Sequence, residues 1–130
     1  MSILAHGIDL VDSARLEKSI ERTGQPFLDR VFTAGEQRYC EFKRKSKLQS
    51  YAGRFAIKEA VMKVLGTGWA KGIAWTDIEV VNEESGQPRL LLHGRCKEIA
   101  DEQGITDIMI SISHIETHAI GSAIAVGDRA

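Results

Sequence analysis

The side chains of Asp9, Glu59 and Lys63 are of the types that bind metal ions and phosphates, and their positions allow them to act together. Asp9 follows a short apolar segment that predicts a strand buried on both faces, and it lies at the end of that strand. Glu59 and Lys63 are four residues apart, so they share one face of a helix, and Ala52 and Ala56 leave room beside them. Magnesium typically takes one or two carboxylates from a protein and completes its shell with water and substrate phosphates. The pattern therefore predicts a metal-assisted phosphate site, in which the lysine contacts a phosphate as a point charge.

These residues also have a plainer interpretation. Glu59 and Lys63 could form a solvated ion pair one helical turn apart, which contributes about 0.2–0.5 kcal/mol. Asp9 could be a turn or capping residue. Asp12 precedes Ser13 at the predicted start of a helix and fits a helix cap better than a metal ligand. The spacing alone leaves both interpretations open.

His114 ends an alternating run in which Ile110 and Ile112 share its face, while Ser111 and Ser113 lie on the other. Because neighbouring strand residues point in opposite directions, Ser113 and His114 do not form a nucleophile pair. An imidazole at a strand end is instead suited to binding a phosphate.

An α+β fold must position these groups, because strands at both ends of the chain enclose several helices. The predicted strands cover residues 3–8, 78–81, 89–92, 108–113 and 119–126. The predicted helices cover residues 13–23, 33–42, 48–65 and 95–103. The helix over 48–65 is apolar around most of its circumference, so we expect a small antiparallel sheet packed against a long buried helix.

The 130 residues are 43% hydrophobic and 27% charged, which is typical of a single domain spanning residues 1–130. No segment resembles a membrane span or a signal peptide, so we expect a soluble cytoplasmic protein that binds no membrane. The net charge of −1, divided as +3 over residues 1–60 and −4 over residues 61–130, does not indicate nucleic-acid binding. Cys40 and Cys96 have no CxxC partners and predict neither a disulfide framework nor a zinc site.

Four segments together resemble the short class of the 4′-phosphopantetheinyl transferase superfamily, the holo-acyl-carrier-protein synthases. The resemblance covers residues 3–126, and the ordered set is far more specific than any one segment. The segments are Gly7-Ile8-Asp9-Leu10-Val11, Arg54-Phe55-Ala56-Ile57-Lys58-Glu59-Ala60-Val61-Met62-Lys63, Gly66-Thr67-Gly68 and Ser111-Ile112-Ser113-His114.

The resemblance implies an enzyme of fatty-acid biosynthesis that moves 4′-phosphopantetheine from coenzyme A to a serine of apo acyl carrier protein, releasing adenosine 3′,5′-bisphosphate. It implies that Asp9 and Glu59 hold Mg²⁺, with Mn²⁺ as an alternative ion, and that Glu59 and Lys63 are catalytic. The coenzyme A contacts that it implies are Arg54, Lys63, Gly66, Gly68 and His114.

The resemblance also assigns a partner surface and an assembly. Arg15, Lys18 and Arg22 form one basic stripe on the helix over 13–23, and family members dock the acidic carrier protein on this helix. Short members form homotrimers with active sites at the subunit interfaces. Two alternatives stay open: a non-catalytic module that docks an acidic protein through this stripe, and a magnesium-dependent nucleotide or diphosphate hydrolase.

Overall fold

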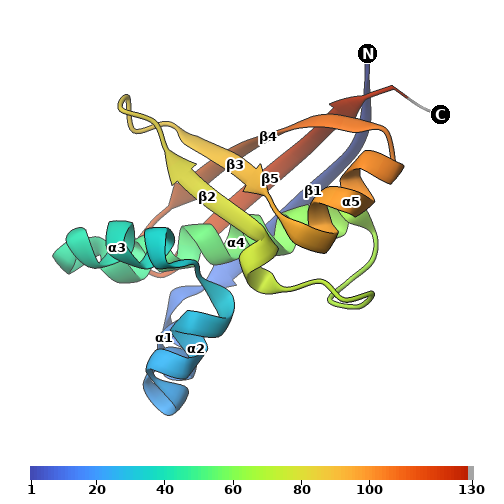
Figure 1. Cartoon of the computed structure of the whole chain (residues 1–130). Coiled ribbons are helices and arrows are strands. Elements are labelled where there is room, and N and C mark those ends of the chain that lie inside the picture. Colours follow the sequence, from blue (N-terminus) through green and yellow to red (C-terminus); the bar gives the residue numbers. More distant parts are fainter. Residues whose placement is uncertain (129–130) are drawn as a thin grey trace.

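A single long helix, α4 (Lys47–Leu65), lies at the centre of the molecule. The computed structural model describes residues 1–128, and Figure 1 shows α4 crossing the strands of the main sheet. Twelve of the 19 residues of α4 are buried. Gly66 ends the helix in the left-handed conformation, at a φ of 74°, where a residue without Cβ has no steric cost. The prediction of a long buried helix with its stop at Gly66 is therefore confirmed.

The main sheet packs on one side of α4 and is antiparallel throughout, in the order β1-β5-β4. Its strands are β1 (Ser2–Asp12), β4 (Ile105–His114) and β5 (His118–Gly127). Two glycines let the sheet approach the helix closely. A Cβ atom on Gly121 would lie 2.8 Å from the backbone of Ala56, and one on Gly7 would lie 2.1 Å from the carbonyl oxygen of Ala60.

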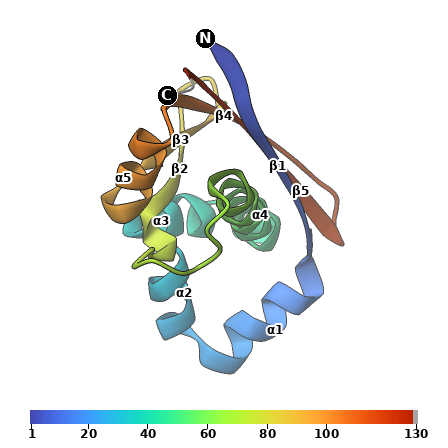
Figure 2. The same ribbon diagram turned by 90° about the vertical axis from the view of Figure 1, so that its right-hand side faces the viewer.

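A hairpin and a helix cover the opposite side of α4 (Figure 2). Strands β2 (Ile78–Asn82) and β3 (Pro88–Leu92) form a separate two-stranded sheet, which follows a 3₁₀ turn, η2 (Trp75–Asp77). Helix α5 (Gly94–Glu102) follows the hairpin. The buried side chains between these layers form the larger of two apolar clusters, which includes Ile57, Val61 and Ile78. The fold is thus α+β, as predicted, with two sheets rather than one.

Three short helices lie between β1 and α4 in the sequence. They are α1 (Ser13–Thr23), α2 (Gln25–Val31) and α3 (Ala34–Phe42), followed by a 3₁₀ turn, η1 (Arg44–Ser46). The Asp12 carboxylate accepts hydrogen bonds from the backbone of Ala14 and Arg15, at 2.9 and 3.3 Å, so its capping role is confirmed. Thr33 and Glu36 form the predicted capping box at the start of α3.

Two expectations need correction at the N-terminus. The strand predicted over 3–8 runs to Asp12, so Asp9 lies inside β1, paired with Gly121, and not at a strand end. This strand is also not buried on both faces, since Ile8 and Leu10 are exposed. A third difference is that the segment around Phe27 is helical. Among the described residues, none of the helices has the length and apolar character needed to cross a membrane.

Candidate active site

Asp9 and Glu59 lie in one pocket between β1, α1 and α4, as the sequence predicts. The side chain of Lys63, one turn after Glu59, reaches the same place. Its Nζ donates a hydrogen bond of 2.7 Å to the carbonyl oxygen of Ile8 and lies 3.1 Å from Oδ1 of Asp9. The ammonium therefore pairs with Asp9, and not with Glu59 as the ion-pair interpretation of the helix required.

The electrostatics of this pocket favour a cation. Burial raises the pKa of Glu59, and the negative charge of Asp9 raises it further. A hydrogen bond from the Trp69 side chain and the charge of Lys63 act in the opposite direction. A carboxylate whose ionised form is costly gains most when a positive ion neutralises it.

The residues present fit a hard divalent ion. Both donors are carboxylate oxygens, the ligands that Mg²⁺ and Mn²⁺ prefer. Within residues 1–128, no group of three or more His, Cys, Asp and Glu side chains is placed to hold a metal. The chain would thus supply two ligands, and the rest of the shell would have to come from water and a phosphate-bearing molecule.

The walls of this pocket are partly apolar and carry one guanidinium from α1. Arg15 lines the pocket together with Leu16 and Phe27, and Phe55 lies beside Glu59 on α4. Arg15 belongs to the exposed basic stripe with Lys18 and Arg22. The pocket therefore opens next to this basic stripe, which is the predicted docking surface for an acidic protein partner.

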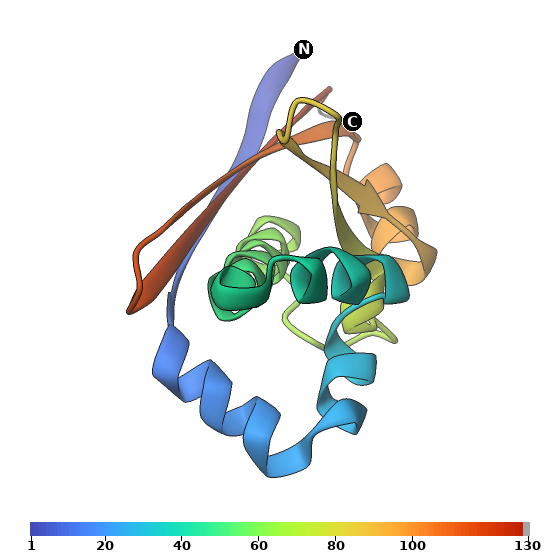
Figure 3. The same cartoon turned by 90° about the vertical axis from the view of Figure 1, so that its left-hand side faces the viewer.

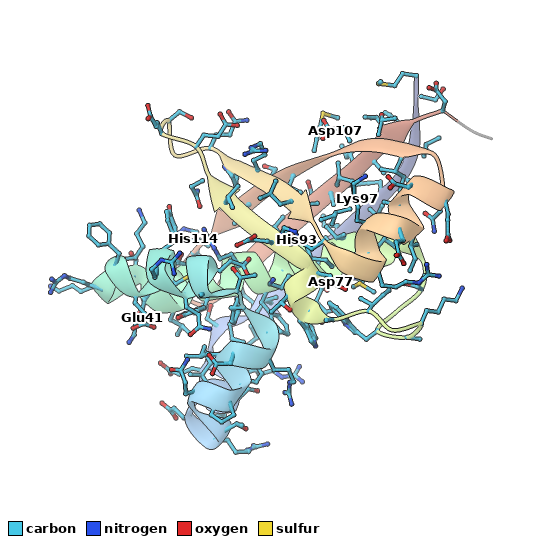
Figure 4. The ribbon with its side chains drawn as sticks, viewed as in Figure 1. Glu41, Asp77, His93, Lys97, Asp107 and His114 are labelled. Atoms are coloured by element: carbon cyan, nitrogen blue, oxygen red, sulfur yellow. The ribbon has the colours of Figure 1, made fainter. Side chains whose placement is uncertain are left out.

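A second, basic pocket lies against the N-terminal half of α4, between α3, the β2–β3 hairpin and the end of β4. Arg54 lines it and is only 3% exposed. Its Nη2 donates a hydrogen bond of 2.5 Å to Oδ1 of Asn82, while its Nε has no partner. His114 enters the pocket from the end of β4 (Figure 4), and Lys43 enters from the end of α3. A buried guanidinium with an unused donor, beside a lysine and an imidazole, fits a phosphate group.

The structure divides the predicted ligand-binding residues into two sets. Asp9, Glu59 and Lys63 gather at the first pocket, and Arg54 and His114 gather at the second. Among their described lining residues, the two pockets have none in common. Residues five apart on a helix are rotated by about 140°, so Arg54 and Glu59 lie on different sides of α4.

Gly66 and Gly68 lie beyond the C-terminal end of α4, outside the lining of both pockets as far as the chain is described. Gly66 caps the helix, and Gly68 has a positive φ of 61°. Trp69 follows in this loop and stacks on Trp75, with ring centroids 3.6 Å apart. The two indoles thus close the core beside Glu59.

Sequence reasoning missed Asn82 and Tyr39. Asn82 accepts from Arg54 and donates a hydrogen bond of 2.9 Å to the carbonyl oxygen of Gly86 in the hairpin turn. The guanidinium carbon of Arg54 lies 4.2 Å from the centre of the Tyr39 ring. An asparagine before a turn is an ordinary turn residue, so only the three-dimensional contact reveals its second role.

Comparisons with known proteins identify the family of the chain. Residues 5–120 match the family described as the 4′-phosphopantetheinyl transferase superfamily. The chain is 46% identical over 121 residues to a holo-[acyl-carrier-protein] synthase of Solibacter usitatus, covering 93% of this chain and 94% of that protein. It is equally identical, over 121 residues, to the corresponding synthase of a Thermoanaerobacter species, with 93% and 86% covered.

Solved structures give the same result. The holo-[acyl-carrier-protein] synthase of Helicobacter pylori, in complex with coenzyme A, is 35% identical with a TM-score of 0.81, covering 93% of this chain and 99% of that chain. The synthase of Neisseria meningitidis is 27% identical with a TM-score of 0.85, covering 96% and 99%. On its sequence and fold, the chain belongs to the 4′-phosphopantetheinyl transferase superfamily.

Proposed function

We propose that this chain, acting as a single domain over residues 1–130, transfers 4′-phosphopantetheine from coenzyme A to a serine of apo acyl carrier protein. The product besides holo acyl carrier protein is adenosine 3′,5′-bisphosphate. The observation that carries the proposal is the meeting of Asp9 and Glu59 in one pocket, with Lys63 paired to Asp9, in a chain 46% identical to a synthase of this activity. By the same kinship, we place the reaction in the cytoplasm, in support of fatty-acid biosynthesis.

Asp9 and Glu59 would hold Mg²⁺, with Mn²⁺ as an alternative. When bound, such an ion neutralises charge that develops on the leaving phosphate of the coenzyme A diphosphate. Lys63 would contact the phosphate from the same face of α4, since its flexible stem can turn from Asp9 toward an incoming anion. Phosphoryl transfer depends on positioning and charge neutralisation, which are the two things these three side chains offer.

In the reaction, the serine oxygen forms a bond to the phosphorus of the pantetheine phosphate, and the bond from that phosphorus to the bridging diphosphate oxygen breaks. The serine proton must leave at the same time. We assign it to a water held in the pocket by Glu59 and Asp9, because carboxylates engaged with a cation are poor bases. The bisphosphate nucleotide leaves with the electron pair of the broken bond.

The basic pocket would hold the nucleotide end of coenzyme A. Arg54 and His114 would contact its 3′-phosphate, and the unpartnered Nε of Arg54 supports this assignment. Lys43 lines the same pocket and would assist. Gly66 and Gly68 stay proposed as coenzyme A contacts, as the family resemblance implies, because a backbone without side chains lets a ligand approach closely.

We infer a homotrimer with active sites at the subunit interfaces. The face of the main sheet that points away from α4 carries exposed apolar side chains, among them Ile8, Leu10, Met109 and Ile120. A contiguous apolar sheet face of this kind marks an interface between proteins. The metal pocket and the basic pocket lie on different sides of α4, so one coenzyme A would reach both most simply across two copies of the chain.

The acidic carrier protein would dock on α1. Arg15, Lys18 and Arg22 are all exposed along one stripe, and Arg15 also lines the metal pocket. A carrier protein bound there would present its serine beside Asp9 and Glu59. Electrostatic docking of this kind weakens as the salt concentration rises.

One experiment tests the proposal. The protein is mixed with apo acyl carrier protein, coenzyme A and Mg²⁺, and the intact mass of the carrier protein is measured. A pantetheinyl adduct together with free adenosine 3′,5′-bisphosphate is the expected result. Cleaved coenzyme A with an unchanged carrier would identify a hydrolase, and binding with no chemistry would identify a docking module; either would refute the proposal.

A further inference from the structure

A buried ion pair connects the elements that form the basic pocket. Lys58 on α4 and Glu36 on α3 are both fully buried, with Nζ of the lysine 2.9 Å from Oε1 of the glutamate. The ammonium also donates to the carbonyl oxygens of Trp75 and Ile78. Its three protons are therefore all used in joining α4 to α3, η2 and β2.

The glutamate completes the same network from its other side. Its Oε2 accepts a hydrogen bond of 2.9 Å from the backbone N–H of Val80 in β2, and its Oε1 accepts one of 2.9 Å from Thr33. The capping box of α3 is thus attached to β2 through one carboxylate. Replacing a buried ion pair by apolar side chains of similar volume is often neutral or stabilising, so stability alone does not account for this pair.

The elements α3, α4 and β2 that the pair joins lie close together (Figure 3), and each contributes residues to the lining of the basic pocket. Helix α3 contributes Tyr39 and Lys43, α4 contributes Arg54, and β2 contributes Asn82. Lys58 lies four residues after Arg54, on the same face of α4 and one turn further along. The contact between Lys58 and β2 therefore lies directly below the hydrogen bond between Arg54 and Asn82.

We propose that Glu36 and Lys58 are positioning residues, which hold α3, α4 and β2 at the spacing that lets Arg54 and Asn82 receive the phosphate of a nucleotide. The inference rests on the proposed function and adds two residues to it. Neither side chain touches the ligand, since both are fully buried. Their effect must appear in nucleotide affinity and not in the turnover of bound substrate.

The informative change is the double variant Glu36→Leu with Lys58→Met, because it removes both charges and leaves no unpaired ion in the core. We expect a lower thermal midpoint, because backbone groups of Thr33, Trp75, Ile78 and Val80 lose their partners, with unfolding still a single cooperative transition. We expect the Kd for adenosine 3′,5′-bisphosphate, measured by calorimetry, to rise at least about tenfold. The KM for coenzyme A should rise in parallel, while kcat at saturating coenzyme A stays within about twofold.

A matched control replaces an exposed pair on α5, Lys97→Met with Asp101→Leu, whose partners lie 2.5 Å apart and away from both pockets. This control should leave the nucleotide Kd unchanged. A double-mutant cycle that combines the double variant with Asn82→Ala distinguishes positioning of Asn82 from a general loss of order around the pocket. If the pair acts through Asn82, that substitution should have little further effect in the double variant, whereas independent effects would multiply.

The outcomes separate cleanly. A double variant that binds the nucleotide as tightly as the unaltered protein would overturn the inference, and so would fully multiplicative effects in the cycle. Failure of the unaltered protein to bind the nucleotide would overturn the proposed function as well. If the double variant does not fold, Glu36→Gln serves instead, since it keeps the acceptor for Lys58 and removes the acceptor for Val80.

Discussion

Replacing Lys63 by methionine should tighten the binding of a metal ion while slowing the reaction. The ammonium of Lys63 lies 3.1 Å from Oδ1 of Asp9 and donates to the carbonyl oxygen of Ile8. In this arrangement it already neutralises one of the two carboxylates that would hold Mg²⁺. A metal ion bound without coenzyme A must therefore compete with Lys63 for Asp9, and it must tolerate a positive charge close by.

The size of the effect follows from the distances. A divalent ion bonded to Oδ1 of Asp9 at about 2.1 Å would lie no more than about 5 Å from the Lys63 ammonium. A double and a single charge at about 5 Å repel by about 1.7 kcal/mol in the dielectric of water. The Lys63 side chain is 54% exposed and that of Asp9 21%, so salt at about 0.15 M reduces this to about 0.9 kcal/mol, roughly fivefold in Kd.

The assay titrates Mn²⁺ into the protein without coenzyme A and detects free Mn²⁺ by electron paramagnetic resonance. Lys63→Met should lower the Kd about fivefold, and turnover with coenzyme A should fall about a hundredfold as a phosphate contact is lost. Lys47→Met is the matched control, because Lys47 is equally exposed at 54% and also forms an ion pair, with Glu41. Unchanged or weaker Mn²⁺ binding by Lys63→Met would refute the reasoning.

Three further predictions test the site, the docking surface and the assembly. Glu59→Gln should abolish turnover and leave the thermal midpoint at pH 7 unchanged or higher. Burial and Asp9 raise the pKa of Glu59, so ionisation of this carboxyl lowers the stability of the folded protein at neutral pH. Calorimetry should therefore show that the difference in thermal midpoint between Glu59→Gln and the unaltered protein shrinks toward pH 4. An active variant would exclude Glu59 as a metal ligand. Arg15→Glu with Arg22→Glu should raise the KM for carrier protein at least about tenfold at low salt and spare the Kd for coenzyme A; an equal loss for both would contradict docking on α1. Leu10→Asp with Ile120→Asp should dissociate the trimer in sedimentation and remove activity, whereas a fully active monomer would be inconsistent with shared sites.

The elements could be predicted wherever their signals are local. Asp12 and Gly24 bound α1 because a carboxylate satisfies the free N–H groups of the first turn and a glycine accepts a positive φ at the stop. Gly66 ends α4 for the same reason. The capping box of α3 is a pattern of four residues and needs no knowledge of the rest of the fold.

The site could be predicted only in part, because its geometry depends on contacts between distant segments. Spacing leaves open an ion pair between Lys63 and Glu59, yet the register of β1 against β5 and the close approach at Gly121 bring Asp9 to the ammonium instead. Lys58 gives no local signal. It lies on a largely apolar helix, but its partner Glu36 is 22 residues away, and only the fold shows that the two meet in the core.

The positions of Arg54 and Glu59 on one helix bear on how copies of the chain would assemble. Five residues of α4 rotate the side chains by about 140°, so the two groups face different walls of a helix about 10 Å across. Within residues 1–128, the structure holds one helix of this length, α4. The apolar outer face of the main sheet provides a surface on which a second copy can supply another. On this reasoning, mixing an Arg54→Ala protein with a Glu59→Gln protein should restore activity, because a mixed trimer contains interfaces that combine an intact Arg54 with an intact Glu59. If each site lay within one chain, the mixture would stay as inactive as its components.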